Sequence, residues 1–287
     1  MRESVRGALA PAAGVAAMLC LAACGNAAPD EQPLRIGMVP DAGATRASVA
    51  EKKPLEDYLS DALGREVELV IPTNYNATVE ALGNGSLDIA YLGGLTFVKA
   101  QQRYGVVPLV QRTIDQQFHS VFIAKRGNGI DSLDDLAGKR FCFGDVNSTS
   151  GNLMPRFVLK QAGVAIEELA ETRQTGSHPA TAQGVAEGAC DAGAMDETVY
   201  RQLVAGGQVD ASEIPVFHTS PSFADYVWAA AGDVSEEDRQ AFSDAMLRLK
   251  RGTNDAVLDI LRGDSFVAAS GDDYGDVEAT ARELGLL

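Results

Sequence analysis

Three consecutive hydroxyl residues stand in the part of the sequence that says most about function. Ser148, Thr149 and Ser150 lie within the run Gly144-Asp-Val-Asn-Ser-Thr-Ser-Gly-Asn-Leu-Met-Pro155. Because proline is tolerated only near a helix start, where N–H groups lack intrahelical partners, the triplet falls on a first helical turn. Hydroxyls, free N–H groups and the positive end of the helix dipole meet there. The sequence therefore predicts an oxyanion site that needs no Lys or Arg.

Other interpretations of this run are weaker. One Ser or Thr would suffice for an ordinary N-cap, whereas here three hydroxyls adjoin Gly151, which permits close approach. The run lacks the G-x-x-x-x-G-K-[ST] pattern of a nucleotide-binding P-loop. Neither Ser148 nor Ser150 has the flanking glycines of a G-x-S-x-G nucleophile elbow. A hydrolase that combines one of these serines with His178 and a carboxylate such as Asp196 stays the lesser alternative, and no catalytic residue is predicted.

The three histidines do not have the spacing of a metal site. His178 precedes Pro179 at a predicted helix start, where it is either a surface cap or a second donor to the anion. His119 and His218 lie at two predicted crossings between lobes. A zinc site would need His or Cys pairs at short spacing, which the sequence lacks. We therefore predict neither a metal nor an organic cofactor.

Strands and helices alternate along the chain and must position the hydroxyl run. Apolar runs at 34–39, 66–71 and 87–92 predict strands with amphipathic helices between them, and the same order restarts at 120–124. Such βαβ units predict largely parallel sheets covered on both faces. The predicted fold class is α/β.

Chain length and crossings predict two lobes. A single core stops growing at roughly 250–300 residues, and the chain has 287. With crossings near 120–125 and 218–224, we expect one lobe at 34–121 plus 222–287 and the other at 122–221. A cleft between lobes is a preferred place for a small ligand.

A short internal repeat supports two equivalent lobes. The segments 85–90 and 188–193 share the pattern Gly, any residue, apolar, Asp, any residue, small. Each follows an amphipathic stretch and opens a predicted strand, as expected where a glycine ends a helix. The repeat alone could be chance.

The amino terminus has the pattern of an export signal. Arg2 and Arg6 precede an uncharged stretch at 7–23 that is too short and broken for a confident membrane span. The tetrad Leu21-Ala-Ala-Cys24 resembles the lipobox of bacterial lipoproteins, and ordinary cleavage is the alternative. We expect a signal peptide at 1–23, lipid attachment at Cys24 and a tether at 24–33. The protein would then be extracytoplasmic and held at the cell membrane by its lipid alone.

Two further cysteines would remain after export, Cys142 and Cys190, both in predicted strands of the second lobe. A disulfide and a pair of buried thiols are both open, because sequence does not fix the geometry that a disulfide needs.

The formal net charge of −16 limits the class of partner. Nucleic acid and anionic membrane surfaces both require clustered Lys and Arg, so neither is expected as a partner. One small oxyanion is still compatible with this acidity, because exposed charges are largely screened beyond about 8 Å at physiological salt.

Several motifs together resemble the phosphonate-, phosphite- and phosphate-type substrate-binding proteins of ABC importers. They are Asp145-x-Asn-Ser-Thr-Ser-Gly-x-x-x-Pro155, Gly176-Ser-His178, Asn74-Tyr75 and Asp88-Ile-Ala-Tyr-Leu-Gly93. The resemblance runs from about Leu34 to Trp228. It implies a type II periplasmic-binding-protein fold, a monomer that closes on its ligand, and a membrane permease and ATPase as partners.

The resemblance also implies roles for single residues. The hydroxyls of the triplet, His178 and Tyr75 would grip the oxyanion, and Asp225 would accept a proton from a P–OH group. A further carboxylate binds the amino group of aminoalkyl phosphonates in some members. Here it is Asp196 or Glu197, because the register slips by one.

The clearest departure from the family is Phe118, which stands where a Tyr is common and adjoins His119. A smaller oxyanion such as phosphite, or arsenite, therefore stays open. Relatives of this fold also serve signalling kinases, so a ligand sensor for a histidine kinase is the alternative to an importer.

Overall fold

The structure is a computed structural model that describes residues 32–43 and 49–287. The predicted signal peptide at 1–23 and Cys24 lie outside these residues, as does most of the predicted tether at 24–33. None of the described helices combines the length and the apolar character needed to cross a membrane.

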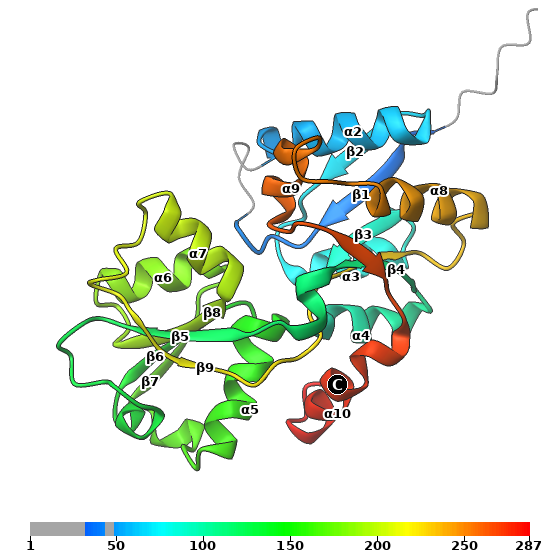
Figure 1. The fold of residues 1–287 in the computed structure, drawn as a ribbon. Helices are drawn as coiled ribbons and strands as arrows, with labels where there is room; N and C mark the ends of the chain where they lie inside the picture. Colours follow the sequence, from blue (N-terminus) through cyan, green and yellow to red (C-terminus); the bar gives the residue numbers. More distant parts are fainter. Residues whose placement is uncertain (1–31, 44–48) are drawn as a thin grey trace, which may run out of the picture. The chain divides into compact units, whose positions relative to one another are not determined.

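The first lobe is built on a six-stranded sheet in the order β11-β4-β10-β3-β1-β2 (Figure 1). β1 runs parallel to β2 and β3, while β10 inserts antiparallel between β3 and β4. β3 and β10 are buried along their whole length, as expected where helices cover both faces of a sheet. The strands are β1 (Leu34–Met38), β2 (Val67–Val70), β3 (Ile89–Leu92), β4 (Val107–Arg112), β10 (Val227–Ala230) and β11 (Phe266–Ala268), and the helices are α2 (Lys53–Leu63), α3 (Tyr75–Gly83), α4 (Gly94–Tyr104), α8 (Glu236–Leu247), α9 (Asp255–Leu261) and α10 (Gly275–Glu283).

The second lobe is built on a five-stranded sheet in the order β7-β6-β8-β5-β9. β6 runs parallel to β7 and β8, and β5 lies antiparallel between β8 and β9. The α/β class with two lobes is thus confirmed. The strands are β5 (Ser120–Ala124), β6 (Arg140–Phe143), β7 (Glu171–Gln174), β8 (Ala192–Asp196) and β9 (Val216–Thr219), and the helices are α5 (Met154–Gln161), α6 (His178–Ala186) and α7 (Glu197–Ala205).

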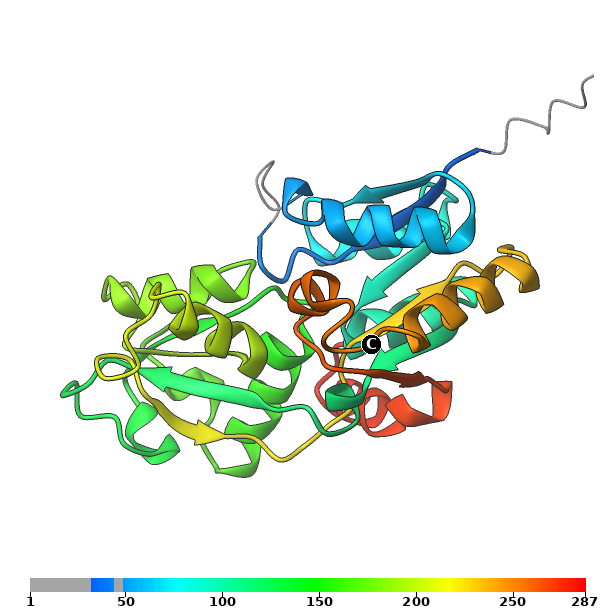
Figure 2. The ribbon, with the colours of Figure 1, turned by 45° about the horizontal axis from the view of Figure 1, so that its top comes forward.

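Two neighbouring segments connect the sheets, and both can be followed in Figures 1 and 2 between β4 and β5 and between β9 and β10. Phe118 and Phe223 form an antiparallel bridge between them, and the N–H of Ser220 donates to the carbonyl of Ser120 at 2.9 Å. β5 begins at Ser120, two residues before the predicted start of the second lobe at 122. The remaining boundaries of the two lobes stay predictions.

The residues of the internal repeat have the same structural roles in both lobes. Gly85 and Gly188 adopt φ values of 73° and 74°, which end the preceding helices without the strain of a side chain. Asp88 then accepts the N–H of Arg35 and pairs with its guanidinium. Asp191 does the same for Arg140. Each aspartate thereby fixes the first residues of the neighbouring strand, β1 or β6.

Three elements were not predicted from the sequence. β7 is exposed at all four residues and β11 has only three, so neither shows an apolar pattern. The sequence predicts two helices at about 235–251 and 253–262 as the last elements of the chain, and this prediction is wrong, because β11 and α10 follow them. The sequence also predicts a short helix at 132–137, which in the structure is a 3₁₀ turn at Leu133–Leu136 with two aspartates in its first turn.

The structure joins Cys142 and Cys190 in a disulfide, with their Cα atoms 5.8 Å apart. Both residues belong to a core cluster of the second lobe that also holds Val185, Met195 and Val199. The bridge connects β6 to the segment before β8 and closes a loop between residues 48 positions apart. It restricts the unfolded chain in the lobe that carries the hydroxyl run.

We expect the double change Cys142→Ala and Cys190→Ala to lower the free energy of unfolding by about 2–4 kcal/mol, because the unfolded chain regains the entropy of an open loop. Urea titration of both proteins measures this difference. Reductant should lower the stability of the wild type and leave the variant unchanged. Equal stability of wild type and variant without reductant would contradict a stabilising cross-link.

Candidate functional site

The hydroxyl run forms a turn of π-helix, Thr149–Leu153, that continues into α5. Ser148 caps this turn, because its Oγ accepts the N–H of Gly151 at 2.9 Å. A Cβ at Gly151 would lie 3.1 Å from the Cα of Gly144 and 3.1 Å from the ring carbon Cε1 of His178. The close approach predicted for Gly151 is therefore present. Single π turns inside helices are rare and are frequent at functional sites.

The three hydroxyls of the run have different partners. Ser148 accepts the capping bond and keeps its own proton to donate. Thr149 accepts the N–H of Leu95 at 3.0 Å and bonds the carboxylate of Asp225, so it connects the second lobe to the first. The Oγ of Ser150 is buried and has no partner among the described residues. A buried hydroxyl without a partner is costly, so Ser150 is the hydroxyl best placed to bind a ligand.

Tyr75 is the first residue of α3, directly after the N-cap Asn74, whose side chain accepts the N–H of Ala77 at 2.8 Å. The ring is 1% exposed, and its hydroxyl has no partner within the described chain. The N–H of Tyr75 donates to the carboxylate of Asp145, the residue that follows Gly144. This bond holds the start of α3 against the hydroxyl run of the other lobe.

His178 lies fully buried at the start of α6. Its N–H donates to the carbonyl of Asp41 at 3.1 Å, across the two lobes. Its Nδ1 accepts the N–H of Asp196 at 3.3 Å, and its Nε2 lies 3.4 Å from the hydroxyl of Tyr226. Burial lowers the pKa of His178, so the ring is neutral, with its proton on Nε2 because Nδ1 accepts. His178 is thus a neutral donor rather than a surface cap.

Asp225 is a buried carboxylate between the lobes. One oxygen accepts the N–H of Gly94 at 3.0 Å, and the other has no partner among residues 32–43 and 49–287. Burial raises the pKa of Asp225 to about 7, and these hydrogen bonds only partly offset it. Near neutral pH the group therefore exchanges a proton readily and can accept or donate one at the site.

The two carboxylates that the sequence left open are placed differently. Asp196 is buried and caps α7 by accepting the N–H groups of Thr198 and Val199, while its second oxygen has no partner in the described structure. Glu197 instead bonds the N–H and Nδ1 of His119, each at 3.1 Å, and pairs with Arg201. The structure therefore puts Asp196, rather than Glu197, beside His178.

Phe118 belongs to a cluster of three buried aromatic rings, Phe118, Tyr91 and Tyr226, which we call the aromatic floor. Its ring meets Tyr226 edge-on at 5.8 Å between centroids, and Tyr226 stacks on Tyr91 at 4.9 Å. The guanidinium of Arg112 lies 5.1 to 5.8 Å from the centres of all three rings. Phe118 is completely buried, so it shapes the floor from the connecting segment.

Sequence reasoning missed four residues of this region: Asp41, Tyr91, Arg112 and Arg262. Asp41 follows β1, just as Gly93, Asp145 and Asp196 follow or end other parallel strands. Because the carboxyl ends of parallel strands are where α/β sheets bind ligands, this position could have indicated Asp41. No local pattern marks Arg262, whose side-chain partners Asp41 and Thr198 are distant in the sequence. Arg112 pairs with the nearby Asp115, but its bond to Leu261 joins residues 149 positions apart.

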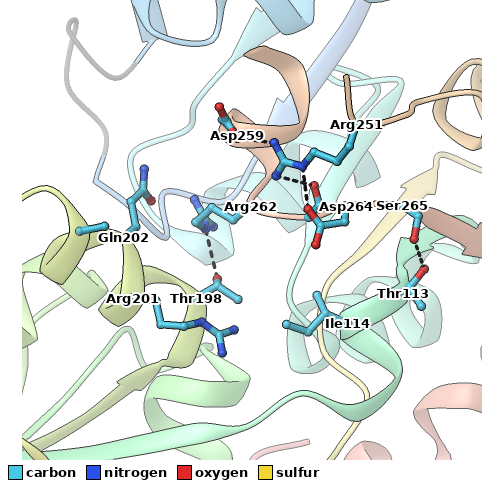
Figure 3. Close-up of a pocket in the computed structure, with 12 residues that line it drawn as sticks. Thr113, Ile114, Thr198, Arg201, Gln202, Arg251, Asp259, Arg262, Asp264 and Ser265 are labelled. Carbon is cyan, nitrogen blue, oxygen red and sulfur yellow. Dashed lines mark hydrogen bonds and ion pairs between the residues drawn. The ribbon is translucent and has the colours of Figure 1, made fainter. Parts of the chain in front are cut away.

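A groove of about 870 Å³ lies beside these buried groups, between α7 and the segment that follows α9 (Figure 3). Arg201, Arg251 and Arg262 line it together with Asp259 and Asp264. Figure 3 shows the side chain of Arg262 directed to Thr198, and that of Arg251 directed to Asp259 and Asp264. The hydroxyl run does not line this groove, so we place the candidate site at the buried unpartnered oxygens.

These oxygens come from both lobes and lie close enough for their charges to interact. The pKa of Tyr75 is raised chiefly by burial and further by Asp41, Asp145, Asp225 and Asp196. In the described part of the chain, no group of three or more His, Cys, Asp or Glu side chains is arranged to hold a metal ion. The arrangement offers donors from neutral groups to a small anion enclosed between two lobes.

Two α/β lobes with polar groups at the carboxyl ends of parallel strands define a two-lobed solute-binding protein of the periplasmic-binding-protein class. The family model for the periplasmic phosphonate substrate-binding protein of ABC transporters matches residues 36–274. The chain belongs to this family and is an extracytoplasmic substrate-binding component of an ABC importer.

Individual relatives agree with this assignment. A probable ABC transporter phosphite binding protein, PhnD1 of Prochlorococcus marinus, is 31% identical over 271 residues, which cover 88% of this chain and 90% of the relative. The structure of PhnD1 in complex with methylphosphonate has a TM-score of 0.82 and 30% identity, and the match covers 88% of this chain and 98% of that one. A phosphate-import protein of Mycolicibacterium smegmatis is 27% identical over 243 residues, 77% of this chain and 75% of the relative.

The raised pKa of Asp225 predicts a pH-dependent stability. With an ordinary pKa of 3.8 when unfolded and about 7 when folded, the native state holds the extra proton between these values. The contribution of Asp225 to the free energy of unfolding is then fully present below pH 4 and is lost as pH rises toward 7, by on the order of 4 kcal/mol in total. In the Asp225→Asn variant the side chain keeps nearly the same shape and no longer titrates.

The free energy of unfolding of Asp225→Asn, minus that of wild type, should therefore rise between pH 4 and pH 7 and stay level above it. Urea titration of both ligand-free proteins at several pH values measures this difference, in which other titrating groups cancel. A difference that does not change with pH would show that Asp225 ionises at an ordinary pKa.

Proposed function

We propose that this protein binds a small phosphorus oxyanion, phosphite or methylphosphonate, between its lobes and delivers it to a membrane permease driven by an ATPase. The observation that carries the proposal is the set of buried, unpartnered oxygens of Tyr75, Ser150 and Asp225. They lie with His178 around the start of one helix, where the dipole favours negative charge. PhnD1, which is named for phosphite and was solved with methylphosphonate, supports this ligand class.

The burial of the site favours a small ligand without an amino group. Tyr75, Ser150, His178 and Asp225 are each at most 1% exposed, which leaves little space around their polar atoms. Glu197, a candidate for an amino group, is already paired with Arg201 and bonded to His119. We therefore expect methylphosphonate and phosphite to bind more tightly than 2-aminoethylphosphonate.

We propose roles for each group on the ligand. Ser148, Ser150 and the N–H groups of the π turn donate to its oxygens, as do Tyr75 and the Nε2 of His178. Thr149 holds the turn against Leu95 and Asp225. Asp225, with a pKa of about 7, shares a proton with a P–O oxygen. The protein works as a monomer, since both lobes of one chain supply these groups.

We further propose that the protein performs no catalysis. The ring nitrogens of His178 face the N–H of Asp196 and the hydroxyl of Tyr226, rather than a serine. The Asp196 carboxylate accepts from the start of α7 and not from the imidazole. A Ser–His–Asp relay requires the nucleophile, base and acid to be bonded in series, so this arrangement favours binding alone.

Titration calorimetry tests the ligand and the site. We expect heat of binding with methylphosphonate or phosphite, and affinities roughly ten- to hundredfold lower for Tyr75→Phe and Ser150→Ala, because each loses about 1.5–3 kcal/mol of charge-assisted hydrogen bonding. Tyr58→Phe and Ser235→Ala are matched controls, since these hydroxyls bond Ala245 and the start of α8 and should not affect affinity.

The ligand should be recovered unchanged after binding, as phosphorus NMR of the same samples would show. Absence of heat with methylphosphonate, phosphite, phosphate and 2-aminoethylphosphonate would refute the ligand class. Equal losses in the site variants and their controls would refute the site.

We also propose a lipid anchor at Cys24, on the strength of the Leu21-Ala-Ala-Cys24 tetrad. Cys24→Ala in the full chain should move the exported protein from the membrane fraction to the soluble fraction. Immunoblotting of fractionated cells measures this, and Cys20→Ala, which changes a cysteine inside the predicted signal, is the matched control. An unchanged membrane fraction would exclude attachment through Cys24.

A further inference from the structure

Arg262 has an unusual backbone conformation at the edge of the groove. It ends α9 with φ 52° and ψ 41°, and among the described residues it is the one non-glycine with positive φ. This conformation costs an ordinary residue free energy and persists where surrounding contacts fix it. Here Arg112 fixes it, because its Nη1 donates to the carbonyls of Leu261 at 2.9 Å and Arg262 at 3.3 Å.

The side chain of Arg262 bonds both lobes at once. It is 7% exposed and forms an ion pair with Asp41, which follows β1 in the first lobe. Its Nε donates to the Oγ1 of Thr198 at 3.3 Å, near the start of α7 in the second lobe (Figure 3). Arg262 itself belongs to the first lobe, so the bond to Thr198 crosses between the lobes.

Hydrogen bonds connect each partner of Arg262 to His178. The carbonyl of Asp41 accepts the N–H of His178 at 3.1 Å. The hydroxyl of Thr198 donates to the carboxylate of Asp196 at 2.7 Å, and the N–H of Asp196 donates to the Nδ1 of His178. A change at Arg262 therefore reaches the orientation of His178 from both sides.

The positive charge of Arg262 also affects the electrostatic environment of His178. Asp41 and Asp196 each act on the electrostatic environment of His178, and Arg262 acts with the opposite sign. An anion beside His178 would be repelled by these two carboxylates unless a cation offset them. Arg262 is buried against Asp41 and supplies that cation without being part of the hydroxyl run.

We propose that Arg262 is a positioning residue that holds the lobes closed on the bound anion through Thr198, and thereby sets the rate at which ligand leaves. This inference rests on the proposed ligand site and adds a residue outside it. The bond to Thr198 breaks when the lobes separate, whereas the ion pair with Asp41 stays within the first lobe. Loss of Arg262 should therefore act on dissociation more than on association.

Stopped-flow kinetics with methylphosphonate test this assignment. For Arg262→Gln we expect dissociation faster by about tenfold or more, with an association rate within about threefold of wild type. Thr198→Val removes the second-lobe acceptor of Arg262, together with the bond from Thr198 to Asp196, and leaves the ion pair with Asp41 intact. We expect this variant to fold normally and to release ligand faster than wild type does. Thr198→Ser keeps the acceptor oxygen and should restore slow release.

Arg251→Gln is the matched control. Arg251 lines the same groove, and its ion-pair partners Asp255, Asp259 and Asp264 all lie in the first lobe. Its loss should leave both rates within about twofold of wild type, because no contact between lobes is removed. The double variant Arg262→Gln and Thr198→Val should accelerate release by less than the product of the two single effects, since both changes break the same contact.

The outcomes separate this inference from the proposed function. If wild type does not bind methylphosphonate or phosphite, the ligand assignment fails. If wild type binds and Thr198→Val releases ligand at the wild-type rate, the role of Arg262 is refuted while the ligand stands. Equal acceleration by Arg251→Gln, or effects of Arg262→Gln and Thr198→Val that multiply, would also refute it.

Discussion

The buried ion pair between Arg112 and Asp115 is the interaction on which the rest of the site depends. Both side chains are completely buried, and the guanidinium donates to the carboxylate through Nε at 2.7 Å. Nη2 donates to the other carboxylate oxygen, Nη1 donates to carbonyls at the end of α9, and the face of the guanidinium lies against the rings of the aromatic floor. The carbonyl of Asp115 accepts the N–H of Asp225 at 3.1 Å. Removing either partner would leave a buried charge unpaired, which costs far more than an exposed pair contributes. One pair thus fixes the connecting segment, the carboxylate of the site and the conformation of Arg262.

The proposed anion site lies among carboxylates, so binding an anion there requires each of those charges to be offset. Asp41 is paired with Arg262, and Asp196 accepts the N–H groups at the start of α7. Burial raises the pKa of Asp225 to about 7, so a large fraction of the molecules carry a protonated Asp225 near neutral pH. Burial likewise raises the pKa of Asp145, which accepts from Asn147 and Tyr75. The acidic residues on the outer helix faces are screened by salt and matter little here. The carboxylates around the proposed site are therefore offset locally, although the chain as a whole carries a formal net charge of −16.

The residues that we propose to contact the ligand adjoin, or themselves form, hydrogen bonds between the lobes. Thr149 bonds Leu95 across the lobes, and it adjoins Ser150 in the π turn. His178 bonds Asp41 across the lobes through its backbone, while its ring faces the site. A ligand that engages these groups gains most when the lobes are closed, and it shifts the equilibrium only by that difference in affinity. The aspartate repeat fixes a strand in each lobe, and the disulfide adds a cross-link within the second lobe, as a hinge motion at the two connecting segments would require.

The sequence alone determined the features that neighbouring residues encode. Alternating apolar runs predicted the α/β class, and the hydroxyl triplet with its glycine and proline predicted a helix start suited to an anion. The family resemblance added Tyr75 and Asp225, which are both buried in the structure. The tertiary structure alone decided that Cys142 and Cys190 pair, that Asp196 rather than Glu197 adjoins His178, and that Arg262 reaches Asp41, 221 positions away. The physical reason is range: caps, turns and periodicity act within a few residues, whereas contacts between lobes depend on how distant segments pack.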